Sequence, residues 1–235
     1  MLAEGTPLAA AGWVAGAFAL AYLVGSIPSA YVIVKLVTGE DVTTHGTGNV
    51  GAMNVRRTTG SWAWFTVAML SDILKGLVPV AAAKWLAGAA MLVPVGVTMT
   101  ERSGSWAMLP MAAVAGAVLG HNYSAWMALI KGRFGRTGKG LSTGAGALLA
   151  YDWRYFVAVV VVGLTTIAIT RYMMAGQVVA AATLPVTAVL VRSPDWAFAL
   201  VMGIVVYVAH HKRFMGLLRG DEPKFYIHDR GGPRG

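Results

Sequence analysis

The sequence of 235 residues contains no cysteine. This absence excludes disulfide bonds, thiolate metal sites and cysteine nucleophiles. The five histidines are not clustered at the spacings that metal ligands use, so we expect neither a metal site nor a cofactor in this chain.

Charged residues are also scarce, at 12% of the chain, whereas hydrophobic residues make up 57%. A soluble domain of this size would have roughly a quarter of its residues charged. The composition therefore excludes a water-soluble fold and predicts an all-α polytopic membrane protein. The 29 glycines favour helices that pack closely in lipid, and we expect residues 1–235 to form a single domain.

Apolar stretches follow one another along the chain almost without pause. They run from about Leu8 to Val34, Trp62 to Ala83, Trp85 to Val97, Trp106 to Ile130, Leu141 to Ala150, Tyr155 to Ile169, Met173 to Val191 and Trp196 to Ala209. Because several are short for a span, some are expected to be tilted, re-entrant or joined to a neighbour. The sequence thus predicts a single bundle of about seven transmembrane helices.

Most of the 19 lysines and arginines fall in three segments, at about residues 35–60, 131–140 and 210–235. Because positively charged loops stay in the cytoplasm, we expect these segments and the C-terminus inside and the N-terminus outside. The multi-pass chain is predicted to lie in a prokaryotic inner membrane. Its net charge of +9 then reflects topology and attraction to anionic lipid, and nucleic-acid binding is not expected.

The first basic segment contains Gly46, Gly48 and Gly51, whose spacing formally matches G-x-G-x-x-G. A dinucleotide-binding fingerprint needs a preceding strand and an acidic residue about 20 positions on, and a helix in lipid provides neither. The loop amides, with Thr47 and Asn49, could instead cradle an anion at the start of the next helix. A glycine-rich connector with basic topology signals is the alternative, and the residues alone do not decide between the two.

The second basic segment contains Gly138-Lys139-Gly140 at the entry to an apolar stretch. It is not a Walker motif, because Gly140 stands where that motif has Ser or Thr. The tripeptide still offers backbone donors, an ammonium group and a favourable helix dipole to a phosphate. His121 and Asn122, which precede it, are either part of such a site or a helix-end pair that bonds local backbone.

Asp72 and Lys75 lie three residues apart near the middle of the apolar stretch 62–83. Ionisable groups there cost several kcal/mol unless they are paired or face a polar cavity. The spacing puts both side chains on one face of a helix. We therefore expect either a structural ion pair or one wall of a polar pocket.

Several motifs together carry a resemblance to a known family. In chain order they are Gly25-Ser-Ile-Pro28, Gly46-Thr-Gly-Asn-Val-Gly-Ala-Met-Asn-Val-Arg-Arg-Thr58, Asp72-Ile-Leu-Lys-Gly76, Gly120-His-Asn122, Gly138-Lys-Gly140 and Gly220-Asp-Glu-Pro-Lys224. Over nearly its whole length the chain resembles the bacterial acyl-phosphate:glycerol-3-phosphate acyltransferase family, the PlsY type. The resemblance implies transfer of a fatty acyl group from acyl phosphate to the 1-hydroxyl of glycerol 3-phosphate. Lysophosphatidic acid and phosphate would be the products, in the first step of phospholipid synthesis.

The resemblance also implies roles for individual residues. The implied substrate-binding positions are Gly46, Gly48, Gly51, Asn54, Arg57, Asn122, Gly138, Lys139, Gly140 and Thr143. The implied catalytic positions are Thr47, Asn49, His121 and His210, with a histidine or the substrate's own phosphate as the proton acceptor. Asp72, Lys75 and Glu222 are expected to wall the pocket or support the structure.

No covalent nucleophile is needed for this chemistry, because acyl phosphate is an activated mixed anhydride that a hydroxyl can attack directly. Positioning and neutralisation of phosphate charge would supply most of the catalysis. The acyl chain would reach the site sideways from the bilayer, along a groove lined by glycine-rich helices.

This sequence departs from the family pattern at five positions. Thr43 stands for Arg, Thr47 for Ser, Ser124 for Pro, Thr137 for Gly and Arg213 for Asn. Threonine at position 47 keeps the hydroxyl, whereas the changes at 137 and 213 alter the chemistry and bear on substrate identity. A substrate-shifted or inactive relative is therefore one alternative. A transporter for an anionic metabolite is the other, although such proteins usually contain internal repeats and we find none.

Overall fold

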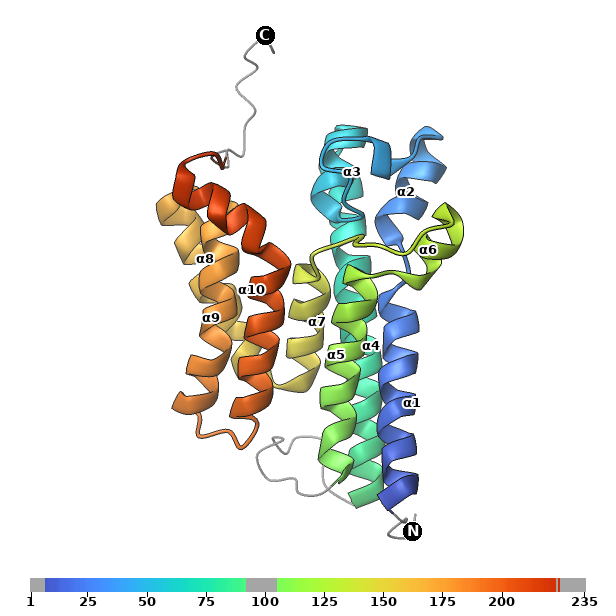
Figure 1. The fold of residues 1–235 in the computed structure, drawn as a ribbon, viewed down its shortest axis with the longest axis vertical. Helices are drawn as coiled ribbons and strands as arrows, with labels where there is room; N and C mark the ends of the chain where they lie inside the picture. Colours follow the sequence, from blue (N-terminus) through green and yellow to red (C-terminus); the bar gives the residue numbers. More distant parts are fainter. Residues whose placement is uncertain (1–6, 92–104, 223, 225–235) are drawn as a thin grey trace.

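The computed structural model describes residues 7–91, 105–222 and 224. Within these residues the chain is α-helical without strands, and its long helices lie side by side in one bundle (Figure 1). The predicted all-α polytopic membrane fold is confirmed.

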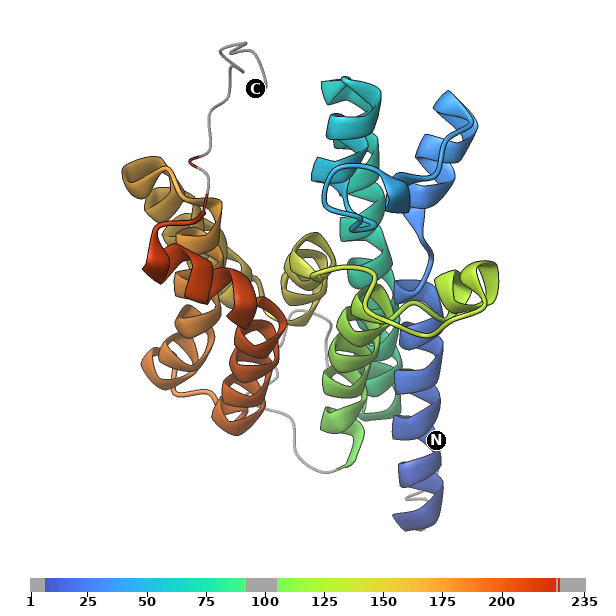
Figure 2. The same ribbon diagram turned by 45° about the horizontal axis from the view of Figure 1, so that its top comes forward.

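The bundle has two sides. One consists of α1 (Pro7–Gly25), α4 (Trp62–Met91), α5 (Met108–Asn122), which the short turn η3 (Ser105–Ala107) precedes, and α7 (Leu141–Tyr151). The other consists of α8 (Trp153–Thr170), α9 (Met173–Leu190) and α10 (Trp196–Arg219). Figures 1 and 2 show the two sides next to each other, and one core of buried apolar side chains joins them.

Glycine permits the close packing of α1 on α5 and of α4 on α7. A Cβ atom at Gly120 would overlap the backbone of Tyr22, and one at Gly146 would overlap the carbonyl oxygen of Ile73. Small residues at helix contacts allow this approach in lipid, where burial of apolar surface does not drive association. The glycine content of the sequence is therefore used at helix crossings.

Short helices gather at the end of the bundle where α10 finishes (Figure 1). They are α2 (Ser29–Thr38), η1 (Val42–Thr44), α3 (Ala52–Thr59) and α6 (Ala125–Lys131). A second cluster of buried apolar side chains, which includes Val42, Val55 and Met127, packs them together. The described parts of all three basic segments consequently lie at one end of the molecule.

The number of spans differs from the prediction. The stretches long and apolar enough to cross a membrane are Ala11–Thr38, Trp62–Gly88, Trp153–Thr170 and Met173–Leu190, which makes 4, or 5 if bent α10 is one span. α5 and α7 have only 15 and 11 residues and are too short to count by length, although both lie within the bundle. About seven spans are therefore not confirmed.

Two predicted apolar stretches prove to be broken. The stretch 8–34 ends one helix at Gly25 and begins another at Ser29, because Pro28 has no amide hydrogen to continue the first. The stretch 106–130 breaks at Ser124, whose hydroxyl accepts a hydrogen bond from the Met127 amide and caps α6. Both breaks lie at the end that carries the basic segments.

The short stretch 85–97 is joined to its neighbour, as expected for some of the short stretches, since α4 continues through Lys84 to Met91. The ammonium group of Lys84 donates to the carbonyl oxygens of Ala150 and Tyr151, at 3.3 and 3.1 Å. The charge is thus satisfied by the C-terminus of α7 and does not interrupt the helix. Residues 92–97 lie outside the described residues.

Candidate active site

The glycine loop before α3 is held from within by Asn54. Its buried side-chain amide donates to the carbonyl oxygens of Val42 and His45, at 2.8 and 3.0 Å, and accepts from the Thr47 amide at 3.2 Å. Gly46 has a φ of 54°, and a Cβ there would overlap the Asn54 oxygen. The two donors of Asn54 are therefore used to shape the loop.

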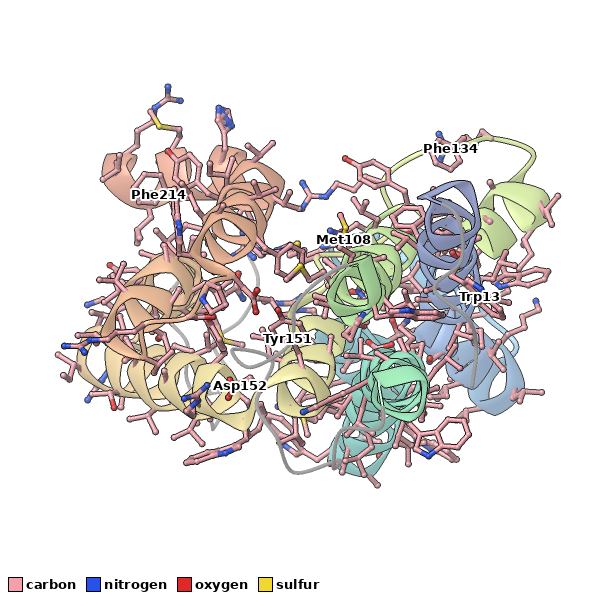
Figure 3. All side chains as sticks on the ribbon, turned by 90° about the horizontal axis from the view of Figure 1, so that it is seen from below. Trp13, Met108, Phe134, Tyr151, Asp152 and Phe214 are labelled. Atoms are coloured by element: carbon pink, nitrogen blue, oxygen red, sulfur yellow. The ribbon has the colours of Figure 1, made fainter. Side chains whose placement is uncertain are left out.

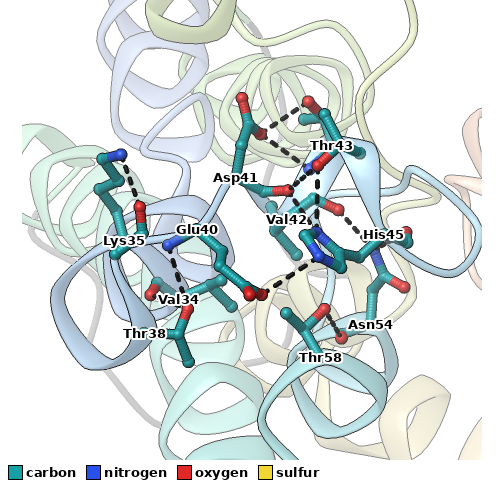
Figure 4. A network of polar contacts seen from close by, with 12 residues as sticks. Val34, Lys35, Thr38, Glu40, Asp41, Val42, Thr43, His45, Asn54 and Thr58 are labelled. Carbon is teal, nitrogen blue, oxygen red and sulfur yellow. Dashed lines mark hydrogen bonds and ion pairs between the residues drawn. The ribbon is translucent and has the colours of Figure 1, made fainter.

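The same loop is tied to α6 through Asp41, whose contacts with Thr43 are drawn in Figure 4. Its carboxylate accepts from the amide and the hydroxyl of Thr43, at 2.9 and 2.7 Å, and pairs with Lys131. Burial acts to raise the pKa of Asp41, but the hydrogen bonds from Lys131 and Thr43 outweigh it and lower the pKa to about 2. Thr43 thus binds a carboxylate at the position where the family usually has Arg.

Thr137 joins the two loops. Its carbonyl oxygen accepts from the Val50 amide at 2.8 Å, and its own amide donates to the carbonyl oxygen of Asn122 at 2.8 Å. Its hydroxyl donates to the carbonyl oxygen of His121 at 2.9 Å. The glycine loop and the Gly-Lys-Gly loop are therefore one connected unit.

Two departures from the family pattern contact each other. The Ser124 amide donates to the Thr137 hydroxyl at 3.2 Å. Proline at position 124 would lack the donor, and glycine at position 137 would lack the acceptor. This chain carries both partners of a bond that the usual family pair cannot form, so the two departures fit one another structurally.

Asp72 and Lys75 form a buried ion pair with 2.8 Å between the carboxylate and the ammonium group. Lys75 also donates to the carbonyl oxygen of Ile27 at 2.9 Å, which anchors the break between α1 and α2. His121 lies beside this pair, with its Nδ1 3.8 Å from Asp72 and 3.2 Å from the Thr143 hydroxyl. The pair is therefore structural and adjoins a predicted site residue, whereas its role as one wall of a polar pocket stays a prediction.

His121 lies directly behind the second loop. A Cβ atom on Gly138 would overlap its imidazole ring, so only glycine allows the loop to approach this closely. Gly140 has a φ of 73°, which favours glycine, and it is the residue immediately before α7. Lys139 is consequently held between two positions that glycine alone fits well.

Basic side chains from different segments surround Lys139. The pKa of its ammonium group falls to about 8, because burial and the nearby charges of Arg213, Arg136 and Arg57 disfavour protonation more than Glu222 favours it. No described acidic residue forms an ion pair with Lys139 itself. The concentration of positive charge at this point fits a phosphate dianion.

Two residues of the C-terminal segment face this region. Nδ1 of buried His210 hydrogen-bonds the Val206 carbonyl oxygen at 2.8 Å, and Nε2 has no partner among the described residues. A neutral ring that donates from Nδ1 presents Nε2 as an acceptor. Glu222 makes a two-point contact with Arg213, with 2.7 Å between Nε and Oε1. Glu222 therefore positions the arginine that stands for the family's usual asparagine.

The remaining predicted residues are divided between the glycine loop and the end of α5. Asn49 donates to the hydroxyl of exposed Thr47 at 3.3 Å. The Asn122 side-chain oxygen is buried without a described partner and lies next to Gly140. Sequence reasoning missed Arg136 as a site residue, and the only signal for it was its place in the basic segment.

An apolar cavity leads away from Gly140 between the two sides of the bundle. It has an empty volume of about 730 Å³, part of it open to the surroundings. Residues of α5, α7, α8, α9 and α10 line it, and its far end is at Tyr151 and Asp195. The sequence analysis expected a groove lined by glycine-rich helices. Only two residues of the cavity lining, Gly140 and Gly144, are glycines. Most of the other lining residues are apolar, and several are alanines.

These features define a class of protein: a multi-pass helical membrane protein with basic side chains gathered around Lys139 at one end and an apolar cavity that starts at the neighbouring Gly140. The sequence profile of the glycerol-3-phosphate acyltransferase family matches residues 15–220. The chain belongs to this family, which confirms the resemblance seen in its motifs.

Relatives with this name match most of the chain. The glycerol-3-phosphate acyltransferase of Gloeobacter violaceus is 33% identical over 211 residues, which cover 89% of this chain and 93% of the relative. That of Trichlorobacter lovleyi is 34% identical over 215 residues, which cover 91% and 96%.

The fold is also similar to crystal structures of PlsY, an integral membrane glycerol 3-phosphate acyltransferase. The glycerol 3-phosphate form has a TM-score of 0.73 and 27% identity, and the lysophosphatidic acid form has 0.70 and 26%. Each comparison covers 93% of this chain and 96% of the solved one.

Proposed function

We propose that this chain transfers a fatty acyl group from acyl phosphate to the 1-hydroxyl of glycerol 3-phosphate, as an enzyme of phospholipid synthesis. The observation that carries the proposal is the convergence of positive charge on Lys139, whose neighbour Gly140 lines an apolar cavity. Both substrates are phosphates, and one carries a hydrocarbon chain. The names of the relatives support glycerol 3-phosphate as the acceptor.

In the proposed reaction the 1-hydroxyl oxygen of glycerol 3-phosphate attacks the acyl carbonyl carbon. The bond between that carbon and the phosphate oxygen breaks, and inorganic phosphate leaves. Lys139 and Arg57, with amides of the glycine loop, hold phosphate and neutralise its charge. Thr47 and Asn49 orient polar oxygens of the substrates.

The hydroxyl proton passes to the substrate's own phosphate or to a histidine. His210 fits the second role better than His121, because Nε2 of His210 has no partner among the described residues. The His121 ring lies behind Gly138 and contacts Thr143. His121 therefore serves to position the loop.

The donor is tested with purified protein, glycerol 3-phosphate and either acyl phosphate or an acyl thioester of the same chain length. Release of phosphate together with lysophosphatidic acid is expected from acyl phosphate alone. Turnover of the thioester without turnover of acyl phosphate would show that the proposed donor is wrong. An absence of lysophosphatidic acid with either donor would rule out the proposed transfer.

We further propose that the end with the basic segments faces the cytoplasm in an inner membrane, with the N-terminus outside. Because the chain has no native cysteine, single cysteines can be introduced by Thr44→Cys, Arg133→Cys and Lys224→Cys. A membrane-impermeant thiol reagent should label all three only from the cytoplasmic side. Labelling of any of them from outside contradicts a single cytoplasmic site.

A further inference from the structure

An aromatic cluster lines the far end of the apolar cavity. The ring of Tyr151 lies 5.9 Å from that of Phe198 and 6.4 Å from that of Tyr155, measured between centroids. All three residues line the cavity, and Figure 3 shows Tyr151 between the two sides of the bundle. Tyr151 is 3% exposed.

Polar contacts hold Tyr151 at both ends of the residue. Its hydroxyl donates to the carboxylate of Asp195 at 2.6 Å, which links α7 to the start of α10. Its carbonyl oxygen accepts from Lys84 of α4 at 3.1 Å. The ring therefore cannot swing aside without breaking a charge-assisted hydrogen bond.

The cavity wall between its two ends is mostly apolar, with Gln177 as a polar exception. Small side chains such as Ala145, Ala181 and Ala199 line its length. α7 runs along it from the phosphate end to Tyr151, and its 11 residues span roughly 16 Å. An extended hydrocarbon of roughly a dozen carbons has this length.

We propose that the ring of Tyr151 is the stop that sets the longest acyl chain this cavity accepts in full. The inference rests on the proposed function, because it assumes that the acyl group lies in the cavity with its phosphate end near Gly140. A chain that reaches Tyr151 meets the ring, and the Asp195 carboxylate behind the ring is a poor environment for a terminal methyl group.

The first test measures kcat/KM for acyl phosphates of increasing chain length. In the wild type, each buried methylene should add about fourfold until the cavity is full, and further methylenes should add nothing. Tyr151→Ala should extend this rise to longer chains. Tyr151→Phe is the matched control, because it keeps the ring, removes the bond to Asp195 and should retain the wild-type limit.

Two results overturn the proposal: an unchanged limit in folded Tyr151→Ala, or a shift in Tyr151→Phe as large as that in Tyr151→Ala. If Tyr151→Ala does not fold, Gly144→Leu tests the same cavity. A Cβ at Gly144 would lie 3.9 Å from Val118, so the position has room for a side chain. The added side chain should shorten the longest chain used, and an unchanged limit overturns the proposal.

A binding measurement separates this inference from the proposed donor. Lysophosphatidic acids of increasing acyl length should raise the melting temperature of the protein until the limit is reached, and Tyr151→Ala should move that limit. If acyl phosphate is not turned over, but the melting temperature stops rising at a certain acyl length and Tyr151→Ala moves that length, then the proposed donor is wrong and the proposed role of Tyr151 stands. If acyl phosphate is turned over, but neither kcat/KM nor the melting temperature shows a limit in acyl length, then the proposed role of Tyr151 is wrong and the proposed donor stands.

Discussion

The two ends of the cavity are built in opposite ways. At the end near Gly140, Lys139 from a loop, Arg57 from α3 and Arg213 from α10 come together, and glycines of positive φ and hydrogen bonds to backbone set the shape of the loops. At the far end, regular helices supply Tyr151 and Phe198, and packing sets the shape. At the basic end, recognition of charge depends on a few side chains. At the far end, the fit of a hydrocarbon depends on the volume that many side chains leave free.

The comparison explains which residues can change. A phosphate site loses most of its affinity when one cation is removed, because each charge-assisted bond is strong. An apolar wall responds to volume and tolerates a change of similar size. Substitutions at the two ends should therefore differ in kind as well as in magnitude.

The largest effect is expected from Lys139→Ala. It removes a charge-assisted contact of about 1.5–3 kcal/mol, so kcat/KM for glycerol 3-phosphate should fall by roughly ten- to a hundredfold. The KM for acyl phosphate and the melting temperature should change little. Arg133→Ala, which removes a charge from an exposed residue of the same segment, serves as the control and should leave both substrates unaffected.

Packing is tested by two glycines of α7. Gly146→Ala places a Cβ against the Ile73 carbonyl oxygen of α4 and should lower the free energy of unfolding by about 1–3 kcal/mol. Gly144→Ala, two residues away, meets no atom closer than 3.9 Å and should be neutral or stabilising. Thermal unfolding in detergent compares them, and equal losses contradict the packing found between α4 and α7.

The lowered pKa of Lys139 predicts that kcat/KM for glycerol 3-phosphate depends on pH. With its pKa lowered to about 8, the ammonium group is charged below pH 8 and loses its proton above it. We expect kcat/KM for glycerol 3-phosphate to fall with rising pH, by about tenfold at one unit above the pKa. Lys139→Arg should abolish this fall of kcat/KM at alkaline pH, because arginine stays charged. If the fall persists in the variant, another group causes it.

The bond between Ser124 and Thr137 should show as a coupling of about 0.5–1.5 kcal/mol in a double-mutant cycle. Ser124→Pro removes the amide donor and Thr137→Gly removes the acceptor. Thermal unfolding of both single variants and the double variant gives the coupling. If the two losses simply add, these departures from the family pattern arose independently of this contact.

The smallest effect is expected at Glu222, which pairs with a partly exposed arginine. Glu222→Ala should cost about 0–1 kcal/mol of stability and lower the yield, without a selective effect on one substrate. Steady-state kinetics for both substrates provide the check. If Glu222→Ala selectively loses glycerol 3-phosphate while Lys139→Ala keeps the wild-type dependence, the roles proposed for the two segments are reversed.

Much of the candidate site could be predicted from the sequence, because several of its contacts join residues that are close together in the chain. Asp72 and Lys75 are three apart, so one helical turn makes them a pair in any helix. Gly138 and Gly140 flank Lys139 directly. The position of Asn54 inside the loop was not predictable, because its partners Val42 and His45 meet it only once the loop has folded.

The continuity of α4 depends on a distant group. Lys84 lies between the apolar stretches 62–83 and 85–97, and carbonyl oxygens of α7, more than 60 positions away, satisfy its charge and let α4 continue. Length and composition give 4 or 5 spans among the described residues, since α5 and α7 are short helices that neighbouring helices bury.

The sequence by itself determined that this chain lies in lipid, that its basic segments share one end, and that its motifs are those of a glycerol-3-phosphate acyltransferase. These properties follow from composition, charge and local spacing. The tertiary structure decided which cations surround Lys139, how Thr137 joins the loops, and that Tyr151 lines the apolar cavity. Such features depend on residues from different segments of the chain. The distances between these residues are set by the packing of the segments against one another, which no local sequence pattern specifies.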